Sequence, residues 1–214
     1  MRLWGSRMGK DLDQEVAVFS TSINEDQALY RYDILGSLAH SQMLLKIGIL
    51  TQQEALEIQR GLLQVMKDIE SKRLDLSLYE DIHSAVEINL KHLIGEPAEK
   101  LHTARSRNDQ IVLDERLYLR EKILDLIRKI NDIQKNILDL AQKYSSLVMP
   151  GYTHLQPAQP VLFAHHLFAY FFMFQRDAER LKDALTRLNC LPLGAGALAG
   201  TSLPIDRKYV ADLL

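Results

Sequence analysis

Apolar residues recur every three to four positions along most of the chain, which is the period of amphipathic helices. The first such stretch predicts a helix from Glu25 to Ile47. Thr51 and Glu54 have the spacing of a capping box and predict the start of a second helix, which reaches about Arg73. The alternation typical of strands is not found between turn signals. The pattern therefore predicts an all-α protein.

The composition changes near residue 105. Ser77 and Glu80 repeat the capping-box spacing before a shorter helix that ends at Ile94, and a glycine and a proline then interrupt the helical pattern. We therefore expect a small helical N-terminal domain at residues 1–105. A second helical region follows at residues 106–214.

The second region opens with an unusually long helical pattern, from about Asn108 to Leu147, without glycine or proline. Such a helix would be roughly 60 Å long at a rise of 1.5 Å per residue. One apolar stripe steps by four and three residues, as in helices that pack against a partner, and a second stripe widens the apolar face and favours a multi-helix bundle. The first stripe comprises Leu119, Ile123, Leu126, Ile130, Ile133, Ile137, Leu140 and Tyr144, and the second includes Leu117, Leu124, Ile127, Leu138 and Ala141.

A further helix is predicted from about Gln159 to Asn189, and it begins with five of the six phenylalanines, which are expected to fill a core. The glycine-rich loop LPLGAGALAG follows, and Asp206 is expected to cap a last helix. The chain stops within the apolar pattern of that helix. This suggests a truncated part of a longer protein.

Composition excludes several classes of partner. With 214 residues, of which 47% are hydrophobic, the chain is long enough for one or two domains. Its formal charge of -2 gives no general attraction to nucleic acid or to anionic membranes. The most apolar window, Val161 to Phe174, is shorter than the roughly 20 residues of a membrane span. The single cysteine, Cys190, cannot form an intrachain disulfide, which suits a reducing cytosol. We predict no nucleic-acid or membrane partner.

The segment HTARSRND, His102 to Asp109, lies where the long helix begins. A helix N-terminus exposes unpaired N–H groups, so an anion such as a carboxylate or phosphate would be held there by backbone, Ser106, Asn108 and an arginine. In the alternative interpretation, Ser106 or Asn108 only caps the helix and the arginines pair with surface acids.

The segment PGYTHLQPAQP, Pro150 to Pro160, contains three prolines and a glycine, so Thr153 and His154 lie in a backbone with few accessible conformers. A histidine on a rigid connection between helices suits a general acid or base near neutral pH. A tight helix–helix turn in which His154 only makes local hydrogen bonds is the alternative.

Other features carry less chemistry. His165 and His166 are adjacent on a helix and point about 100° apart, unlike metal ligands at an i, i+4 spacing. Metal binding by this pair of histidines is therefore not expected. No CxxC, HExxH, Walker loop or GxGxxG motif is found.

Taken together, these segments resemble argininosuccinate lyase, in the superfamily that also includes fumarase, aspartase, adenylosuccinate lyase and the delta-crystallins. The resemblance begins at RLWGSR and runs through FSTSI, EDIH, IGEPAEKLHTARSRNDQ, MPGYTHLQPAQP and LPLGAGALAG, so it covers essentially the whole chain. It implies a reversible β-elimination of argininosuccinate to arginine and fumarate, without a cofactor, in a cytoplasmic enzyme of arginine biosynthesis.

The resemblance also implies roles for individual residues. His154 matches the catalytic acid-base histidine, although its role as acid, base or orienting group stays open. His83, in EDIH, matches a family histidine near the site. The matching substrate-binding residues are Ser22, Ser106, Arg107, Asn108 and Thr153. In the family each active site combines three motifs from three subunits of a homotetramer, whose central helices form one bundle. The resemblance therefore implies that residues 106–214 are the first part of a central helical-bundle domain.

Two features differ from the family pattern. Ala104 replaces a glycine of the first motif, so the loop must differ if that position needs a positive φ. The third motif, a mobile GSS-type loop with the catalytic serine and a lysine, has no counterpart in these 214 residues. The chain alone is therefore expected to be inactive. A delta-crystallin-like structural protein, a helical assembly module, and a lyase for another succinyl substrate are the alternative readings.

Overall fold

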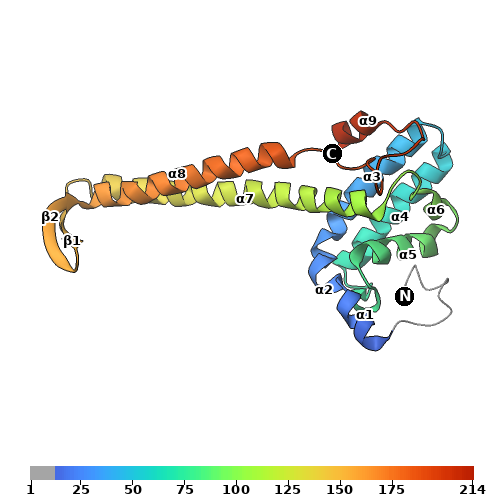
Figure 1. Cartoon of the computed structure of the whole chain (residues 1–214), viewed down its shortest axis with the longest axis horizontal. Coiled ribbons are helices and arrows are strands. Elements are labelled where there is room, and N and C mark those ends of the chain that lie inside the picture. Colours follow the sequence, from blue (N-terminus) through green and yellow to red (C-terminus); the bar gives the residue numbers. More distant parts are fainter. Residues whose placement is uncertain (1–12) are drawn as a thin grey trace. The chain divides into compact units, whose positions relative to one another are not determined.

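The computed structural model describes residues 13–214, and the RLWGSR stretch of the resemblance lies outside them. The elements are α1 (Gln14–Ser20), α2 (Ile23–Asp26), η2 (Gln27–Leu29), α3 (Tyr30–Lys46), α4 (Gln52–Glu70), η3 (Leu76–Leu78), α5 (Ile82–Ile94), α6 (Pro97–Lys100), α7 (Arg107–Lys143), β1 (Val148–Thr153), β2 (Gln156–Leu162), α8 (Phe163–Leu188) and α9 (Arg207–Leu213) (Figure 1). The predicted all-α class is confirmed, with one small two-stranded sheet added in the described residues.

The chain forms two compact units. Residues 13–118 and 191–214 belong to unit 1, and residues 119–190 form unit 2, so helix α7 contributes residues to both. The division predicted at residue 105, which concerns the domains of the whole protein, stays a prediction.

The helix starts of unit 1 test the predicted caps. The Thr51–Glu54 capping box is present at α4, and Asp206 caps α9 by accepting from the Tyr209 N–H at 2.9 Å. The cap predicted at Ser77 is wrong, because Asp81 caps α5 and Ser77 lies in η3. An aspartate accepts a helix N–H as well as a serine does, so Ser77 and Asp81 were equally suitable N-cap residues by type.

The core of unit 1 lies among α3, α4 and α5, with α9 packed on α3. Close helix contact favours glycine where α3 meets the first turns of α7, because a Cβ on Gly36 would lie 2.9 Å from Leu113 Cδ2 and the leucine would have to shift. This contact brings the start of α7 against the core. The largest fully buried apolar side chains are Ile34, Met43, Leu44, Ile58, Leu62, Ile82, Leu90 and Val65.

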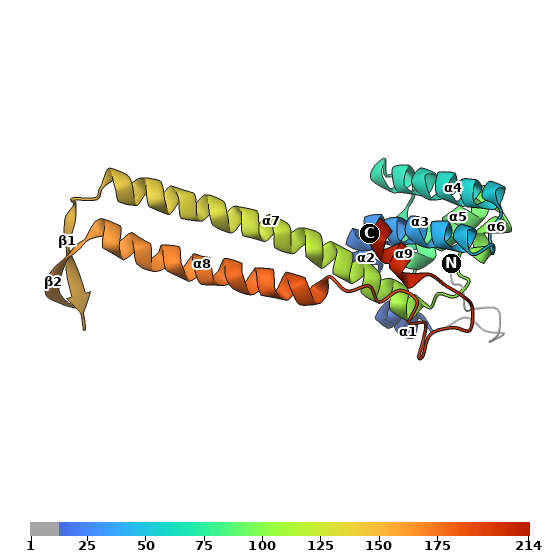
Figure 2. The same ribbon diagram turned by 90° about the horizontal axis from the view of Figure 1, so that it is seen from above.

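In unit 2, α7 and α8 lie side by side and antiparallel, and the β1–β2 hairpin joins them (Figures 1 and 2). The buried side chains on the part of α7 that belongs to unit 2 are Ile127, Ile130, Gln134 and Ala141. The Gln134 amide donates to the Phe171 carbonyl and to Gln175 Oε1, both at 3.2 Å, which ties the two helices together.

The predicted stripe on α7 is divided between a covered and an open face. Ile130 is buried, whereas Leu119, Leu126, Ile133 and Leu140, spaced seven residues apart, remain 42–47% exposed. None of the five phenylalanines of α8 is fully buried within the chain. Unit 2 by itself therefore leaves much of its apolar surface uncovered.

The stiff connection predicted at Pro150–Pro160 is a β-hairpin, so the helix predicted from Gln159 begins only at Phe163. Prolines are tolerated here because each strand of a two-stranded sheet has one unpaired edge. Gly151 is required by close approach, since a Cβ there would lie 2.9 Å from the Gln159 carbonyl oxygen. Within the described residues no helix is both long and apolar enough to cross a membrane.

Candidate functional site

Ser106 and Asp109 cap the first turn of α7 reciprocally. Ser106 Oγ accepts from the Asn108 N–H at 3.3 Å, and the Ser106 N–H donates to Asp109 Oδ1 at 2.9 Å. The arrangement resembles a capping box, with aspartate in place of glutamate and with the serine accepting from the residue before the aspartate. Ser106 therefore has the capping role that the sequence left as an alternative, and this role leaves its hydroxyl proton available to a ligand.

Arg107 and Gln110 attach the same turn to α5 and α3. One Arg107 nitrogen donates to Glu87 Oε2 at 2.9 Å, and another donates to Gln110 Oε1 at 3.3 Å. The Gln110 amide in turn donates to Asp33 Oδ1. Among residues 107–110, only Asn108 has an exposed side chain. The turn therefore presents Asn108 to solvent from a backbone held on several sides.

His40 supports the loop that precedes this turn. Its Nε2 lies 2.9 Å from the Thr103 carbonyl oxygen. Burial, assisted by the charge of Arg105, lowers the pKa of His40 to about 4, so the ring is neutral and donates from Nε2. Next to Thr103, Ala104 has a φ of 60°, so this position of the motif does have a positive φ. The position does favour glycine, and the alanine adopts the left-handed conformation at an energetic cost.

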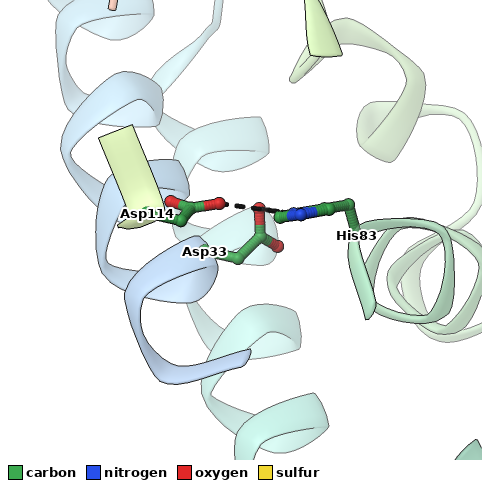
Figure 3. Close-up of side chains that lie close together, drawn as sticks. All are labelled: Asp33, His83 and Asp114. Carbon is green, nitrogen blue, oxygen red and sulfur yellow. Dashed lines mark hydrogen bonds and ion pairs between the residues drawn. The ribbon is translucent and has the colours of Figure 1, made fainter. Parts of the chain in front are cut away.

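Beneath the turn lies a buried cluster of Asp33, His83 and Asp114, from α3, α5 and α7 (Figure 3). His83 Nδ1 is 3.2 Å from Asp33 Oδ1 and 3.3 Å from Asp114 Oδ2. Burial opposes the imidazolium charge, but hydrogen bonds to Asp114 and Asp33 outweigh it and raise the pKa of His83 to about 10. His83 is therefore a cation between two carboxyl groups at neutral pH.

The two carboxyl groups of the cluster differ. Burial and the nearby charge of Asp33 raise the pKa of Asp114 to about 8. Burial also opposes ionisation of Asp33, but the hydrogen bond and charge of His83 prevail and lower its pKa. Asp33 therefore carries the negative charge of the cluster at neutral pH, and Asp114 holds a proton.

The donor types of the cluster, two carboxylates and an imidazole, would suit a divalent cation, and one donor atom from each residue lies within 4.8 Å of the others. Metal ligands must be deprotonated. A cation would have to displace the protons that His83 and Asp114 hold at neutral pH. As it stands, the cluster is built as a hydrogen-bonded ion group.

A small cavity of about 10 Å³ adjoins the cluster. Its lining includes Asp33, His83, His102, Arg105 and Gln110 together with apolar side chains. A cavity of about 10–15 Å³ holds roughly one water molecule. Within this chain, the cavity therefore has no room for a substrate the size of a dipeptide.

Comparison with known proteins then identifies the chain. A family model described as a lyase matches residues 6–214. The chain belongs to this lyase family. Among curated relatives, the argininosuccinate lyase of Pelotomaculum thermopropionicum is 53% identical over the whole chain, which covers 46% of that protein. The argininosuccinate lyase of Geobacter sulfurreducens is 50% identical, with 100% of this chain and 47% of that protein covered. The chain thus spans about half the length of the curated relatives it matches.

Solved structures agree on the fold. A variant of EDDS lyase with bound fumarate is 34% identical, with a TM-score of 0.79, and the match covers 86% of this chain and 36% of that chain. The β-carboxy-cis,cis-muconate cycloisomerase of Acinetobacter calcoaceticus has a TM-score of 0.72 at 22% identity and covers 92% and 46% of the two chains. The second likeness concerns the fold alone.

The predicted site residues of this lyase-family chain fall into two groups. Ser22, Ser106, Arg107 and Asn108 belong to unit 1, and Thr153 and His154 belong to unit 2. The Ser22 hydroxyl donates to Asp26 Oδ2 at 2.6 Å, and the Asp26 carboxylate also accepts the Ile82 N–H at 3.0 Å. This aspartate orients Ser22 and leaves its oxygen lone pairs available.

Thr153 and His154 lie at the tip of the hairpin and are exposed. His154 and Leu155 form its two-residue loop with φ of 50° and 62°. Such loops usually contain asparagine and glycine, because a side chain with positive φ costs about 1–2 kcal/mol per residue. Backbone strain of this kind clusters at functional sites. Leu155 is 93% exposed, so the tip presents an imidazole and an apolar side chain together.

Sequence reasoning missed Asp33, Asp114 and Gln110, which form the buried support of the turn. A signal was present, because Asp33 and Asp114 are acidic residues set in apolar helical stretches, YDIL and IVLDER. An ionisable residue on a buried helical face needs a partner. Which partner it finds cannot be read from its neighbours in sequence.

Proposed function

We propose that the protein to which this chain belongs is an argininosuccinate lyase, which splits argininosuccinate reversibly into arginine and fumarate in the last step of arginine biosynthesis. The observation that carries the proposal is the match of the whole chain to argininosuccinate lyases at about 50% identity. The reaction is a β-elimination that breaks a carbon–nitrogen bond. It needs no metal or organic cofactor.

The chemistry explains the residue types. Removal of a proton next to a carboxylate builds a second negative charge, so fixed donors must hold the anion before a base can act. We assign substrate binding to Ser22, Ser106, Arg107, Asn108 and Thr153. His154 is assigned an acid-base role, supported by its presentation on a strained, exposed turn. Of the substrate-binding residues, Arg107 has the weakest support, because its guanidinium already binds Glu87 and Gln110.

A homotetramer with shared active sites fits the same proposal. Leu119, Leu126, Ile133 and Leu140 expose an apolar heptad stripe on α7. Such a stripe is expected to pack against further helices. Sedimentation of the complete protein tests the assembly, and a monomer at micromolar concentration would contradict it. The cytoplasmic location proposed with it is tested by cell fractionation.

The test of the function uses the complete gene product and a substrate panel: argininosuccinate, adenylosuccinate, and fumarate with ammonia. We expect fumarate release from argininosuccinate alone. His154→Asn should lower kcat by about 10²–10⁴-fold, the usual contribution of an acid-base group. His166→Asn, another exposed histidine of the same unit, is the matched control and should retain activity. Turnover of adenylosuccinate in preference to argininosuccinate would refute the substrate assignment.

These 214 residues alone are proposed to have negligible lyase activity, because the family's third motif is not among them. Mixing the chain with complete protein that carries His154→Asn should restore part of the activity if sites are shared between subunits. Appreciable fumarate release by the purified chain alone would contradict the proposal.

A further inference from the structure

A single carboxylate joins the start of α7 to the glycine-rich loop. Asp109 Oδ2 accepts the Gly194 N–H at 2.9 Å and the Gly196 N–H at 2.7 Å, while Oδ1 accepts the Ser106 N–H at 2.9 Å. Asp109 is 4% exposed. Hydrogen bonds to an ionised acceptor are about twice as strong as neutral ones, so three on one buried carboxylate form a strong junction.

The loop is shaped to receive a carboxylate. Gly194 and Gly196 both have positive φ, of 95° and 63°, and their N–H groups converge on one oxygen. Backbone amides of a turn that converge on one point form concave anion sites. The Arg207 side chain holds the other side of the loop, with Nε 3.1 Å from the Leu193 carbonyl oxygen and Nη2 3.2 Å from that of Leu191. The receptor is therefore fixed independently of Asp109.

We propose that Asp109 is a positioning residue for Asn108: its carboxylate, seated in a carboxylate receptor formed by Gly194 and Gly196, locks the glycine-rich loop to the first turn of α7. The role of Asn108 rests on the proposed function, whereas the receptor does not. Arg107 and Gln110 hold the turn to α5 and α3, and Asp109 is its link to the loop. Without that link, the backbone at Asn108 gains freedom on one side.

The chemistry of the receptor separates three variants. Asp109→Ala empties the receptor and leaves room for a small carboxylate such as formate. Asp109→Asn keeps the side-chain volume but has only one acceptor oxygen. Either the Ser106 N–H or the two glycine N–H groups would then face an amide N–H₂ instead of an acceptor. Asp132→Ala, at an exposed aspartate further along α7, is the matched control.

The first measurement is hydrogen exchange of the Gly194 and Gly196 amides in the complete protein. Both should exchange about 10–100-fold faster in Asp109→Ala, given the usual strength of hydrogen bonds to charged groups. Millimolar formate should slow the exchange of both amides again in Asp109→Ala. It should not change their exchange in Asp109→Asn or Asp132→Ala. Unchanged amide exchange in Asp109→Ala, or no effect of formate on it, would contradict the proposed carboxylate receptor.

The second measurement is turnover of argininosuccinate. Asp109→Ala should raise KM and lower kcat, giving about a tenfold or larger loss of kcat/KM, and formate should restore part of it. Formate should not rescue Asn108→Ala. Restored amide protection without restored turnover would overturn the positioning role and leave the receptor standing. If the wild-type protein does not turn over argininosuccinate, the proposed function is wrong. The hydrogen-exchange result still tests whether Gly194 and Gly196 form a carboxylate receptor.

If Asp109→Ala does not fold, Asp109→Asn carries the test. Its Gly194 and Gly196 amides should exchange faster than in the wild type while the core amides of α3 and α4 keep their protection. Equal exchange of the two loop amides in Asp109→Asn and wild type would refute the proposal.

Discussion

The buried imidazolium of His83 should make the stability of unit 1 depend on pH in the alkaline range. Its pKa is about 10 in the folded protein, against an ordinary value of 6.5. The folded state therefore binds this proton more tightly than the unfolded chain. The resulting stabilisation is fully present below pH 6.5 and is lost as the pH rises through 10.

The magnitude follows from the same two values. Because one pKa unit corresponds to about 1.4 kcal/mol, the bound proton favours folding by about 4 kcal/mol near pH 7 and by about 1 kcal/mol near pH 9.5. His83 is only 2% exposed, so solvent screens the interaction little. The raised pKa of Asp114, about 8, acts in the same direction, because that proton is also lost as the pH rises. The two contributions are not additive, since the groups interact directly.

Urea unfolding at a series of pH values tests this. The free energy of unfolding of the wild type should fall by about 3 kcal/mol between about pH 7 and 9.5. His83→Leu should destabilise the protein at neutral pH by about 3–5 kcal/mol, because it leaves two buried carboxyl groups without their cation, and should flatten the alkaline slope. His92→Gln, at an exposed histidine of the same helix, should change stability by less than about 0.5 kcal/mol. Parallel pH profiles for wild type and His83→Leu would refute the reasoning.

Three further changes probe local features. Ala104→Gly should raise the free energy of unfolding by about 0.5–1 kcal/mol, because glycine removes the cost of a φ of 60°, and a fall in thermal stability would contradict this. Gly151→Ala should destabilise the hairpin by about 1–3 kcal/mol, since its Cβ would lie 2.9 Å from the Gln159 carbonyl oxygen; unchanged exchange of hairpin amides would count against it. Gln134→Leu should lower the stability of unit 2 by about 1 kcal/mol in urea unfolding, because it removes the donor of two hydrogen bonds and leaves their acceptors on Phe171 and Gln175 in place; unchanged or raised stability would contradict this.

The helices were predictable because their signals are local. The cap at Thr51, the cap at Asp206 and the long run without glycine or proline each depend on residues within a few positions. The β-hairpin was missed because three prolines argue against a strand unless both strands are edges. That condition is a property of the sheet and cannot be seen in one strand.

The same distinction holds for the candidate site. Local sequence patterns were enough to predict the helical class, the two motif segments at residues 102–109 and 150–160, and Asn108 and His154 as the residues to test. It is the packing of distant segments that brings Arg107 to Glu87, Asp33 and Asp114 to His83, and Asp109 to glycines 85 and 87 residues further along the chain. Periodicity reports which face of a helix is buried. The partner of a buried polar group is set by how distant helices pack, and no local pattern encodes that choice.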